Sequence, residues 1–457
     1  MNTLIWFQRD LRIHNNPSLE WAMSQGKPVI AIYIYSPEED AAWTEGAASR
    51  WWLHHSLSNL AKSLLDLNIK LYFVKGNSVE TINTWVKNHN IDSVVWTNRV
   101  EPYRATCETK IESVLNKQNI IVKRFSNGLL SSPSDFVTIS NQSAYRVFTP
   151  FYRRLRSELN YSDFYSSSQL INNTTLTEIT NSKNTYTLNE LALLDTHNWH
   201  SKLHIYWSPG ENIAHEKLDD FIDDKLLSYI SDRDYPSIDA TSALSPHLHF
   251  GEISLQQIIT ALIPLIQGNK IKHSEAAEGF LRQLIWREYA QYIMFHFPHT
   301  AIKPMNEKYQ QDFWKDDDKL LEKWKQGNTG IILVDAGMKQ LWETGSMHNR
   351  VRMLTASLLT KNIGINWRHG AQWFWDTLVD ADLANNSMGW QWVAGCGVDA
   401  APYFRIFNPD TQSKKFDKQN TYSNFWLKSS NLINETIVDL GSSRKEALER
   451  YKTHIKN

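Results

Sequence analysis

Carboxylates, amides and indoles lie close together in one short segment, which reads LVDADLANNSMGWQW over residues 378–392. The side chains that could do chemistry are Asp380, Asp382, Asn385, Asn386, Trp390 and Trp392. Two carboxylates at this spacing could serve hydrolysis or bind a metal, but no third carboxylate or histidine adjoins them. Combined with amides and indoles, they suit the binding of a polar planar heterocycle better than bond cleavage by water.

Hydroxyl groups gather in a second segment, DATSALSPHLHFGEIS over residues 239–254. Ser245 followed by a proline predicts a helix start, with the serine as the N-cap. Thr241 and Ser242 add hydroxyls just upstream, and the free N–H groups of a helix N-terminus suit a phosphate. Ordinary helix capping accounts for the same residues without a ligand.

A third segment, residues 344–375, is basic and contains no acidic residue. Its cationic and aromatic members are His348, Arg350, Arg352, Lys361, Trp367, Arg368, His369, Trp373, Phe374 and Trp375. Interleaved cations and planar side chains fit a phosphate backbone and unstacked bases. A solvated helix face over a core would have the same composition, so both interpretations stay open here.

The bulk properties limit the class of protein. The chain has 457 residues, 42% of them hydrophobic, which predicts two or three domains. Cys107 and Cys396 are the only cysteines, too few for a disulfide scaffold, a four-cysteine zinc site or an iron–sulfur cluster. His247 and His249 have no third ligand close by, so no metal site is expected. With no signal peptide or membrane-length apolar run in view, we expect a cytoplasmic protein with no membrane partner.

Short buried strands alternate with helical segments over the first ~125 residues. The expected strands are 4–7, 29–35, 70–74, 93–97 and 120–125, and the clearest helix is 47–67. Such alternation predicts a doubly wound parallel α/β domain. The first turn, FQRDLRIHNN, lacks the glycine pattern of dinucleotide-binding loops.

The remainder of the chain divides into a polar connection and a helical domain. Residues 166–187 are rich in serine, threonine and asparagine, which is typical of an exposed connection. Helical periodicity then covers 213–230, 252–267, 274–296, 318–326, 334–344, 349–362 and 369–380. The predicted domains are therefore an α/β domain at 1–130, a connection at 131–204 and an all-α domain at 205–457.

Read in order, these segments resemble the DNA photolyase/cryptochrome family. The motifs that carry the resemblance are WFQRDLRIHNNPSL (6–19), YRVFTPFYRRLR (145–156), the segment 239–254, FLRQLIWREY (280–289), TGSMHNRVRM (344–353) and residues 380–409. GAASRWWLHHSL (46–57) is similar to the bacterial branch nearest the plant cryptochromes. The resemblance spans essentially the whole chain and implies an antenna-chromophore domain followed by a helical FAD-binding domain.

The resemblance also implies which residues bind FAD. Those expected at the phosphates, the ribityl chain and the ring system are Tyr229, Thr241, Ser242, Ala243, Leu244, Ser245, Phe280, Asn349, Arg352, Asp380, Ala381, Asp382 and Asn386. Arg352, Asp380 and Asp382 would bracket the isoalloxazine. Asn386 would face its N5 atom, where an amide, unlike an acid, cannot release a proton.

By the same resemblance, Trp390, Trp367 and Trp314 would form an electron-transfer chain that ends near the surface. The residues expected to contact a flipped-out pyrimidine dimer are Gln283, Trp286, Arg287, Asn349, Met353 and Trp392. Trp390 and Trp392 would thus serve cofactor and substrate, respectively. Repair members of the family usually carry glutamate at the position of Gln283, so the efficiency of repair is open.

The implied reaction is light-driven repair of cyclobutane pyrimidine dimers by electron transfer from reduced FAD, which makes the chain a deoxyribodipyrimidine photo-lyase. The alternative is a cryptochrome-type blue-light receptor without repair activity; a flavin redox enzyme is disfavoured because the nicotinamide fingerprint is missing. Damaged DNA is the expected partner of a monomer. For the antenna we expect methenyltetrahydrofolate first, near Trp43 or Trp51, and a deazaflavin second.

Overall fold

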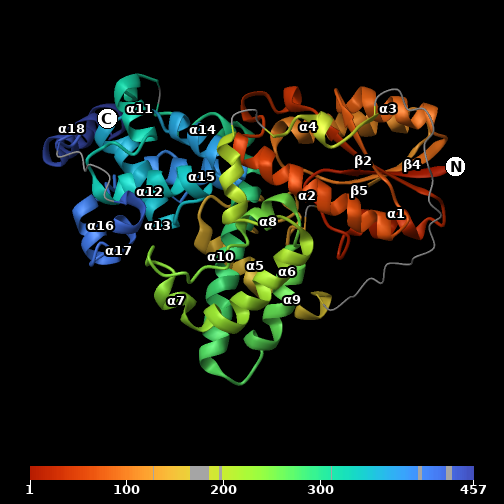
Figure 1. The fold of residues 1–457 in the computed structure, drawn as a ribbon, viewed down its shortest axis with the longest axis horizontal. Coiled ribbons are helices and arrows are strands. Elements are labelled where there is room, and N and C mark those ends of the chain that lie inside the picture. The colour runs from red at the N-terminus through yellow and green to blue at the C-terminus, as the bar shows by residue number, and fades with distance from the viewer. Residues whose placement is uncertain are drawn as a thin grey trace.

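The computed structural model describes residues 1–126, 128–164, 185–194, 198–309, 311–399, 404–428 and 435–456. Most of the predicted exposed segment 166–187 lies outside these ranges. The predicted fold class is confirmed, because an α/β domain is followed by a helical domain (Figure 1). Among the described helices, none is both long enough and apolar enough to cross a membrane.

The α/β domain contains one sheet with the strand order β5-β4-β1-β2-β3-β6. The strands are β1 (Asn2–Phe7), β2 (Val29–Tyr35), β3 (Leu71–Lys75), β4 (Ile91–Thr97), β5 (Ile121–Phe125) and β6 (Thr185–Tyr186). The first five are parallel, at the places that the sequence predicts. The two-residue β6 was not predicted; it comes from the connection and pairs antiparallel with β3.

Helices cover both faces of this sheet. They are α1 (Pro17–Ser24), α2 (Ala47–Asp66), α3 (Ser78–Asn88) and α4 (Pro102–Asn116). Side chains of β1 alternate between the faces: Ile5 and Phe7 pack in one core cluster with α1 and α2, whereas Leu4 and Trp6 pack with α3 and α4. The strands are buried on both faces, which explains their continuous apolar sequences.

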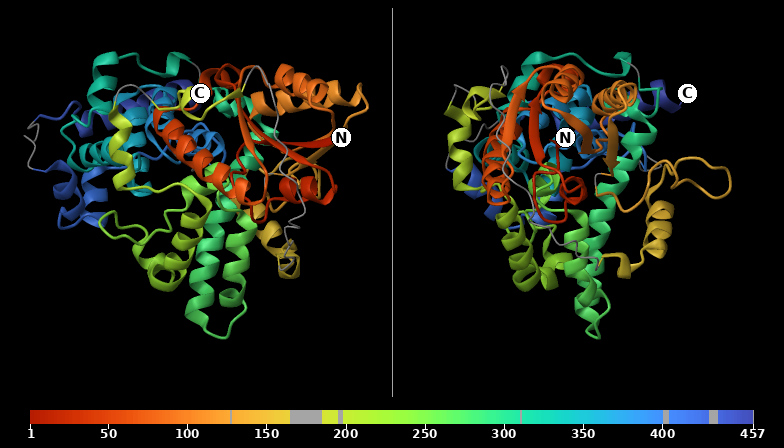
Figure 2. Two further views of the ribbon diagram at one scale, coloured as in Figure 1. Left: turned by 45° about the vertical axis from the view of Figure 1, so that its right-hand side comes forward. Right: turned by 90° about the vertical axis from the view of Figure 1, so that its right-hand side faces the viewer.

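The helical domain surrounds two further core clusters. Its helices are α6 (Glu211–Asp220), α7 (Tyr229–Asp232), α8 (Ser245–Phe250), α9 (Leu255–Ile266), α10 (Ile271–His296), α11 (Asp318–Lys325), α12 (Ile332–Thr344), α13 (Asn349–Ser357), α14 (Trp367–Thr377), α15 (Leu383–Ala394), α16 (Pro409–Phe416), α17 (Thr421–Leu427) and α18 (Leu440–Tyr451). Helices α9 and α10 form a hairpin that extends below the sheet domain (Figure 2). The helix predicted at 213–230 is interrupted by a π-helical turn at 221–225, and the helix predicted at 349–362 ends in one at 358–363.

Part of the predicted connection belongs to the helical core. Helix α5 (Phe148–Glu158) lies within it, and its Phe148, Phe151 and Leu155 are buried in the same cluster as side chains of α9 and α10. The domain limits at 130 and 204 stay predictions, but residues 148–158 pack with the second domain.

The two domains share a core at the end of α8. Phe250 packs within the α/β cluster and stacks on Trp52 of α2, with ring centroids 6.0 Å apart. The Trp52 indole N–H donates to the buried carboxylate of Glu252 at 3.1 Å. Between these residues, the Gly251 carbonyl accepts a hydrogen bond from Arg12 at 2.9 Å. The loop after β1 therefore holds α8, one wall of the cavity described below, against the sheet domain.

Gly251 offers a direct test of this docking. Its φ is +70°, and a Cβ there would lie 2.0 Å from the Arg9 carbonyl oxygen. Gly26 has a similar φ of +64° with nothing within 4 Å, so Gly26→Ala is a matched control for backbone strain, about 1–2 kcal/mol. We expect Gly251→Ala to cost at least about 2 kcal/mol more, because overpacking adds to the strain. Equal denaturation midpoints for the two variants would contradict this.

Candidate cofactor and substrate site

A cavity of about 1060 Å³ lies within the helical domain, between α7, α8, α10, α13, α15 and α17. Its lining includes most of the residues predicted from the family resemblance: Tyr229, Thr241, Ser242, Ala243, Leu244, Ser245, Phe280, Gln283, Arg287, Asn349, Arg352, Met353, Asp380, Ala381, Asp382, Asn386 and Trp390. The predicted residues that do not line it are all tryptophans, Trp286, Trp314, Trp367 and Trp392. The volume is at the upper end of the usual range for ligand sites.

An ion pair and a hydroxyl form one corner of the cavity. Arg352 donates from Nη2 to both oxygens of Asp380 at 3.1 Å, and the Ser245 hydroxyl donates to Asp380 Oδ2 at 2.7 Å. The prediction of Ser245 as N-cap is wrong: Leu244 precedes the helix and Ser245 is its first residue. Its hydroxyl is directed to Asp380 instead, which links α8 to the start of α15.

Asp382 is a buried carboxylate with a nearly full set of donors. Its Oδ1 accepts from the main chain and side-chain amide of Asn385, both at 2.9 Å, which makes it the N-cap of α15. Its Oδ2 accepts from Gln291 Nε2 at 2.9 Å and lies 3.5 Å from His249 Nδ1. Burial alone would raise the pKa of Asp382, but His249, Arg287 and the Asn385 donors hold it well below its usual value. The group is therefore an anion at neutral pH.

Gln291 was missed by the sequence analysis, although a signal existed. Gln283, Arg287 and Gln291 are spaced by four along α10, so they share one face of the helix. This polar stripe interrupts an otherwise largely apolar helix and marks the side that meets the cavity and Asp382. Burial lowers the pKa of His249, which lies beside Asp382, to about 4.

His348 and Arg350 of the basic segment, with partners at Arg233 and Asp234 that the sequence analysis missed, fix the cavity on the α13 side. The imidazole of His348 accepts at Nδ1 from the Arg350 N–H at 3.2 Å and meets the Arg233 carbonyl oxygen through Nε2 at 3.0 Å. Burial lowers the pKa of His348 to about 4, so the neutral ring carries its proton on Nε2. Arg350 pairs with Asp234 at 2.6 Å.

The side chains of α15 that face the cavity are held by α14. Asn386 donates from Nδ2 to the Ala371 carbonyl oxygen at 2.9 Å. Trp390, 3% exposed, packs edge-to-face on Phe374 with centroids 5.0 Å apart. A Cβ at Gly370 would lie 2.1 Å from the Trp390 ring, so glycine at that position lets α14 approach the indole.

The other two tryptophans of the predicted chain lie behind Trp390, in the same core cluster. Trp367 begins α14. Trp314 precedes Lys315, whose N–H donates to the Gly364 carbonyl at 2.8 Å, so its segment runs beside the approach to α14. Trp314 was expected near the surface and is only 7% exposed. A further indole, Trp324, lies 6.1 Å from Trp390 and was not predicted.

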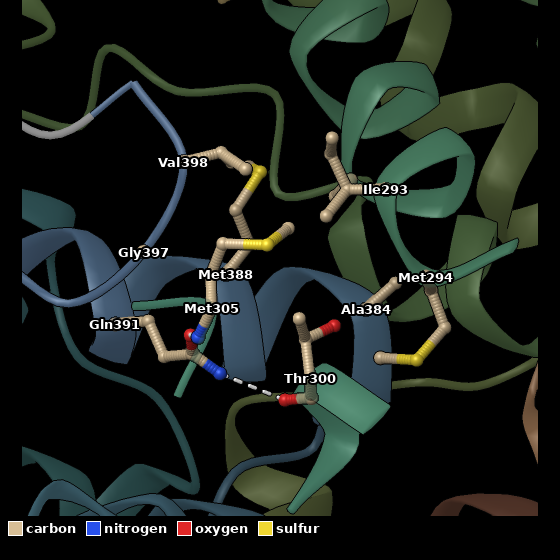
Figure 3. Close-up of a pocket in the computed structure, with 10 residues that line it drawn as sticks. Ile293, Met294, Thr300, Met305, Ala384, Met388, Gln391, Gly397 and Val398 are labelled. Atoms are coloured by element: carbon tan, nitrogen blue, oxygen red, sulfur yellow. Dashed lines mark hydrogen bonds between the residues drawn. The ribbon is translucent and has the colours of Figure 1, made fainter. Parts of the chain in front are cut away.

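Gln391 lies between Trp390 and Trp392 in the sequence, and its side chain contacts a different part of the chain. Its Nε2 donates to the carbonyls of Thr300 and Lys303, and its Oε1 accepts from the Met305 N–H, at 2.8, 3.0 and 2.9 Å. Figure 3 shows this side chain reaching Thr300 beside a small void. The void measures about 10 Å³, space for one water at most, so it is a packing gap.

Trp286 and Trp392 are each engaged elsewhere. Trp286 stacks on Phe148 of α5, with centroids 3.5 Å apart and planes 10° apart. The Trp392 indole N–H donates to the Asp399 carbonyl at 3.1 Å. Both are partly exposed, and each neighbours a cavity-lining residue on its own helix, Arg287 or Val393.

The basic segment 344–375 does not form a continuous cationic surface. Lys361 is 1% exposed, its ammonium lies over the Phe404 ring, and burial lowers its pKa well below the usual value. Arg350 and Arg352 pair with carboxylates in the cavity. Arg368 remains exposed. Within the described ranges, no cluster of three or more His, Cys, Asp or Glu side chains could hold a metal ion.

Comparison with known proteins gives a consistent result. Residues 3–169 match the family model described as DNA photolyase, and residues 280–455 match the FAD binding domain of DNA photolyase. The chain is 40% identical to the deoxyribodipyrimidine photo-lyase of Agrobacterium fabrum, over 92% of this chain and 85% of the relative. It is 33% identical to Cryptochrome-1 of Arabidopsis thaliana, over 93% of this chain and 62% of the relative.

Among solved structures, a bacterial class III photolyase from Agrobacterium tumefaciens superimposes with a TM-score of 0.92 at 36% identity, covering 100% of this chain and 98% of the other. The domain order agrees with these matches, and the cavity lining from Phe280 to Trp426 lies within the match to the FAD binding domain. The chain therefore belongs to the DNA photolyase/cryptochrome family.

Proposed function

We propose that this protein repairs cyclobutane pyrimidine dimers in DNA in a light-driven reaction with reduced FAD, as a deoxyribodipyrimidine photo-lyase. The observation that carries the proposal is that one cavity gathers both sets of residues. Asp380 and Asp382, which would bracket the flavin, share it with Gln283 and Met353, which would meet the dimer. Cofactor and lesion would thus lie in contact, as electron transfer between them requires.

The lining fits a flavin nucleotide. Thr241, Ser242 and Ser245 supply hydroxyls for a phosphate and ribityl chain, and the same lining offers carboxylates, amides and aromatic side chains for a ring system. Asp380 is already oriented by Arg352 and Ser245. Bound FAD would supply light absorption and the transferred electron; the protein residues bind it, orient it and exclude water.

Asn386 supports a reduced cofactor. One N–H of its amide is engaged by the Ala371 carbonyl, which leaves Oδ1 as an acceptor on the cavity side. A carbonyl oxygen accepts from the N–H that a flavin carries at N5 only when protonated there. Because the amide has no acidic proton, it stabilises that state without proton exchange.

The dimer would enter from the side of Gln283, Arg287, Asn349 and Met353. An intact dimer must leave the duplex to reach a buried flavin. Photolyases are a standard example of such base flipping. In the net reaction two carbon–carbon bonds between the pyrimidines break, and the borrowed electron returns. Gln283 can direct its NH₂ at a dimer carbonyl and stabilise the added charge.

A cryptochrome-type light receptor is the second candidate, favoured by the similarity to Cryptochrome-1. The two candidates differ in what they do to DNA. Illumination of the reduced protein with a dimer-containing oligonucleotide should remove dimers under the repair proposal, and dark samples should keep them. If illumination does not lower the number of dimers, and the protein binds damaged and intact DNA with equal affinity, only the receptor proposal remains.

An antenna chromophore is proposed with methenyltetrahydrofolate first and a deazaflavin second. Trp43 and Trp51, the predicted neighbours, are 4% and 3% exposed. Trp43 packs edge-on against Trp375, and Trp51 against Trp52 and His55. A chromophore there would have to lie beside these pairs rather than between their rings. Absorption spectra of the purified protein, beyond the flavin bands, distinguish the two chromophores.

Trp390→Phe tests the electron-transfer chain. Phenylalanine is much harder to oxidise than indole, so we expect photoreduction of oxidised FAD to fall at least tenfold, while chemically reduced protein still repairs. Trp96→Phe, at a fully buried indole in β4, controls for loss of a tryptophan from a core. Wild-type photoreduction by the Trp390 variant would mean that this residue only packs against Phe374.

Gln283→Glu tests the departure from the family pattern. A glutamate carboxylate can accept a charge-assisted hydrogen bond from a dimer N–H, roughly twice as strong as a neutral one. A protonated glutamate could donate to a dimer carbonyl. We expect a higher quantum yield of dimer splitting at unchanged FAD content, measured on fully reduced proteins under the same light. If the glutamate variant repairs no better, the amide is matched to Arg287 and its other neighbours, and this electrostatic account is wrong.

A further inference from the structure

The two tryptophans that flank the proposed lesion side are supported by one turn. Directly after α15 the chain passes through Gly397 and Val398, visible in Figure 3 beside Met388, and reaches Asp399. Asp399 has a φ of +50°, a left-handed conformation that glycine, asparagine and aspartate adopt more readily than other residues. Such a residue persists where its surroundings fix it.

Trp286 rests on a column of aromatic side chains from the start of α5. Phe148, 1% exposed, covers one face of the indole, and Tyr152 stacks behind Phe148 at 5.7 Å. The guanidinium of Arg282 lies 5.5 Å from the Phe148 ring. The segment that was predicted to be a connection therefore covers one face of the Trp286 indole.

Asp399 links this column to Trp392. Its carbonyl oxygen accepts from the Trp392 indole N–H at 3.1 Å, its Oδ1 accepts from the Phe148 N–H at 3.4 Å, and its own N–H donates to the Arg146 carbonyl at 3.3 Å. The main chain of Asp399 thus holds one tryptophan. Its side chain holds the residue on which the other tryptophan stacks.

We propose that Asp399 is a positioning residue for lesion recognition, which fixes Trp286 and Trp392 relative to each other through Phe148. The inference rests on the proposed repair function. Preorganised rings bind an extruded base without the entropy cost of ordering them first. Three exposed arginines lie nearby in the sequence: Arg146 just before α5, Arg153 in α5 and Arg282 in α10. They can contact phosphates next to the flipped bases.

Two substitutions separate the side-chain oxygen from the turn conformation. Asp399→Gly removes the acceptor for the Phe148 N–H but adopts a positive φ without strain. Asp399→Asn keeps an acceptor oxygen at the same place and also tolerates this conformation. If Asp399 only formed a turn, both variants would behave like the parent protein.

We expect Asp399→Gly to lower the preference for dimer-containing over intact DNA about fivefold, within the range for losing one well-stacked base. Asp399→Asn should retain the preference. FAD content and photoreduction should be unchanged in both, because Asp399 makes none of the contacts of Asp382, Asn386 or Trp390. A glycine variant with the parental preference, or an asparagine variant as weak as glycine, would overturn the proposal.

A second measurement needs no DNA and is independent of repair. In protein labelled with 5-fluorotryptophan, the fluorine resonance of Trp286, assigned through Trp286→Phe, reports the ring current of Phe148. It should move in Asp399→Gly and stay in place in Asp399→Asn. An unmoved resonance in the glycine variant overturns the positioning role even if repair is active. If instead the parent protein shows no damage preference while the resonance moves, the repair function fails and the structural link stands.

Discussion

The position of α15 depends on a buried carboxylate. Asp382 caps this helix through Asn385 and is held from the other side by Gln291 of α10 and by His249 of α8. Removing a carboxylate from water is costly unless donors surround it, and here three elements supply them. The buried anion is stable only where these donors are in place, so Asp382 requires α8, α10 and α15 to meet at this point. Asn386 and Trp390 lie further along α15, so their positions in the cavity depend on that junction.

The α/β domain contributes to the site without lining most of it. Phe250 is inserted into the core of the sheet domain, and the loop after β1 binds the main chain around Gly251. The wall of the cavity formed by α8 is therefore as rigid as the sheet. A charged cluster at the carboxyl ends of the strands lies on the same side: Arg9 pairs with Glu45, and Arg99 with Glu101. Arg99 holds the pKa of the buried Glu101 below its usual value, and the charge of Asp382 works against this lowering, so charges of the two domains interact here.

The sequence predicted the fold class, the five parallel strands and, through the family resemblance, 17 of the residues that line the cavity. These follow from local patterns: apolar strands, helical periodicity and motifs whose residues lie within a few positions of each other. The failures are contacts between distant segments. Ser245 was taken as an N-cap because local spacing could not show Asp380 opposite its hydroxyl. Lys361 was counted as a cation for DNA because charge is visible in sequence and burial beneath Phe404 is not. The support of Trp286 by Phe148, 138 positions away (286 minus 148), has no local signature.

Helical geometry explains how three consecutive residues of α15 serve three different contacts. Successive side chains on an α-helix point about 100° apart, so Trp390, Gln391 and Trp392 diverge although they are adjacent in sequence. Trp390 meets the cavity and α14, Gln391 binds the chain around Thr300, and Trp392 reaches Asp399. Gln391 gives this arrangement its precision, because a buried amide with three hydrogen bonds allows neither rotation nor sliding of the helix without leaving polar groups unpaired. The polar residue between the two indoles therefore sets the angle at which both are presented, Trp390 toward the cavity and Trp392 toward Asp399.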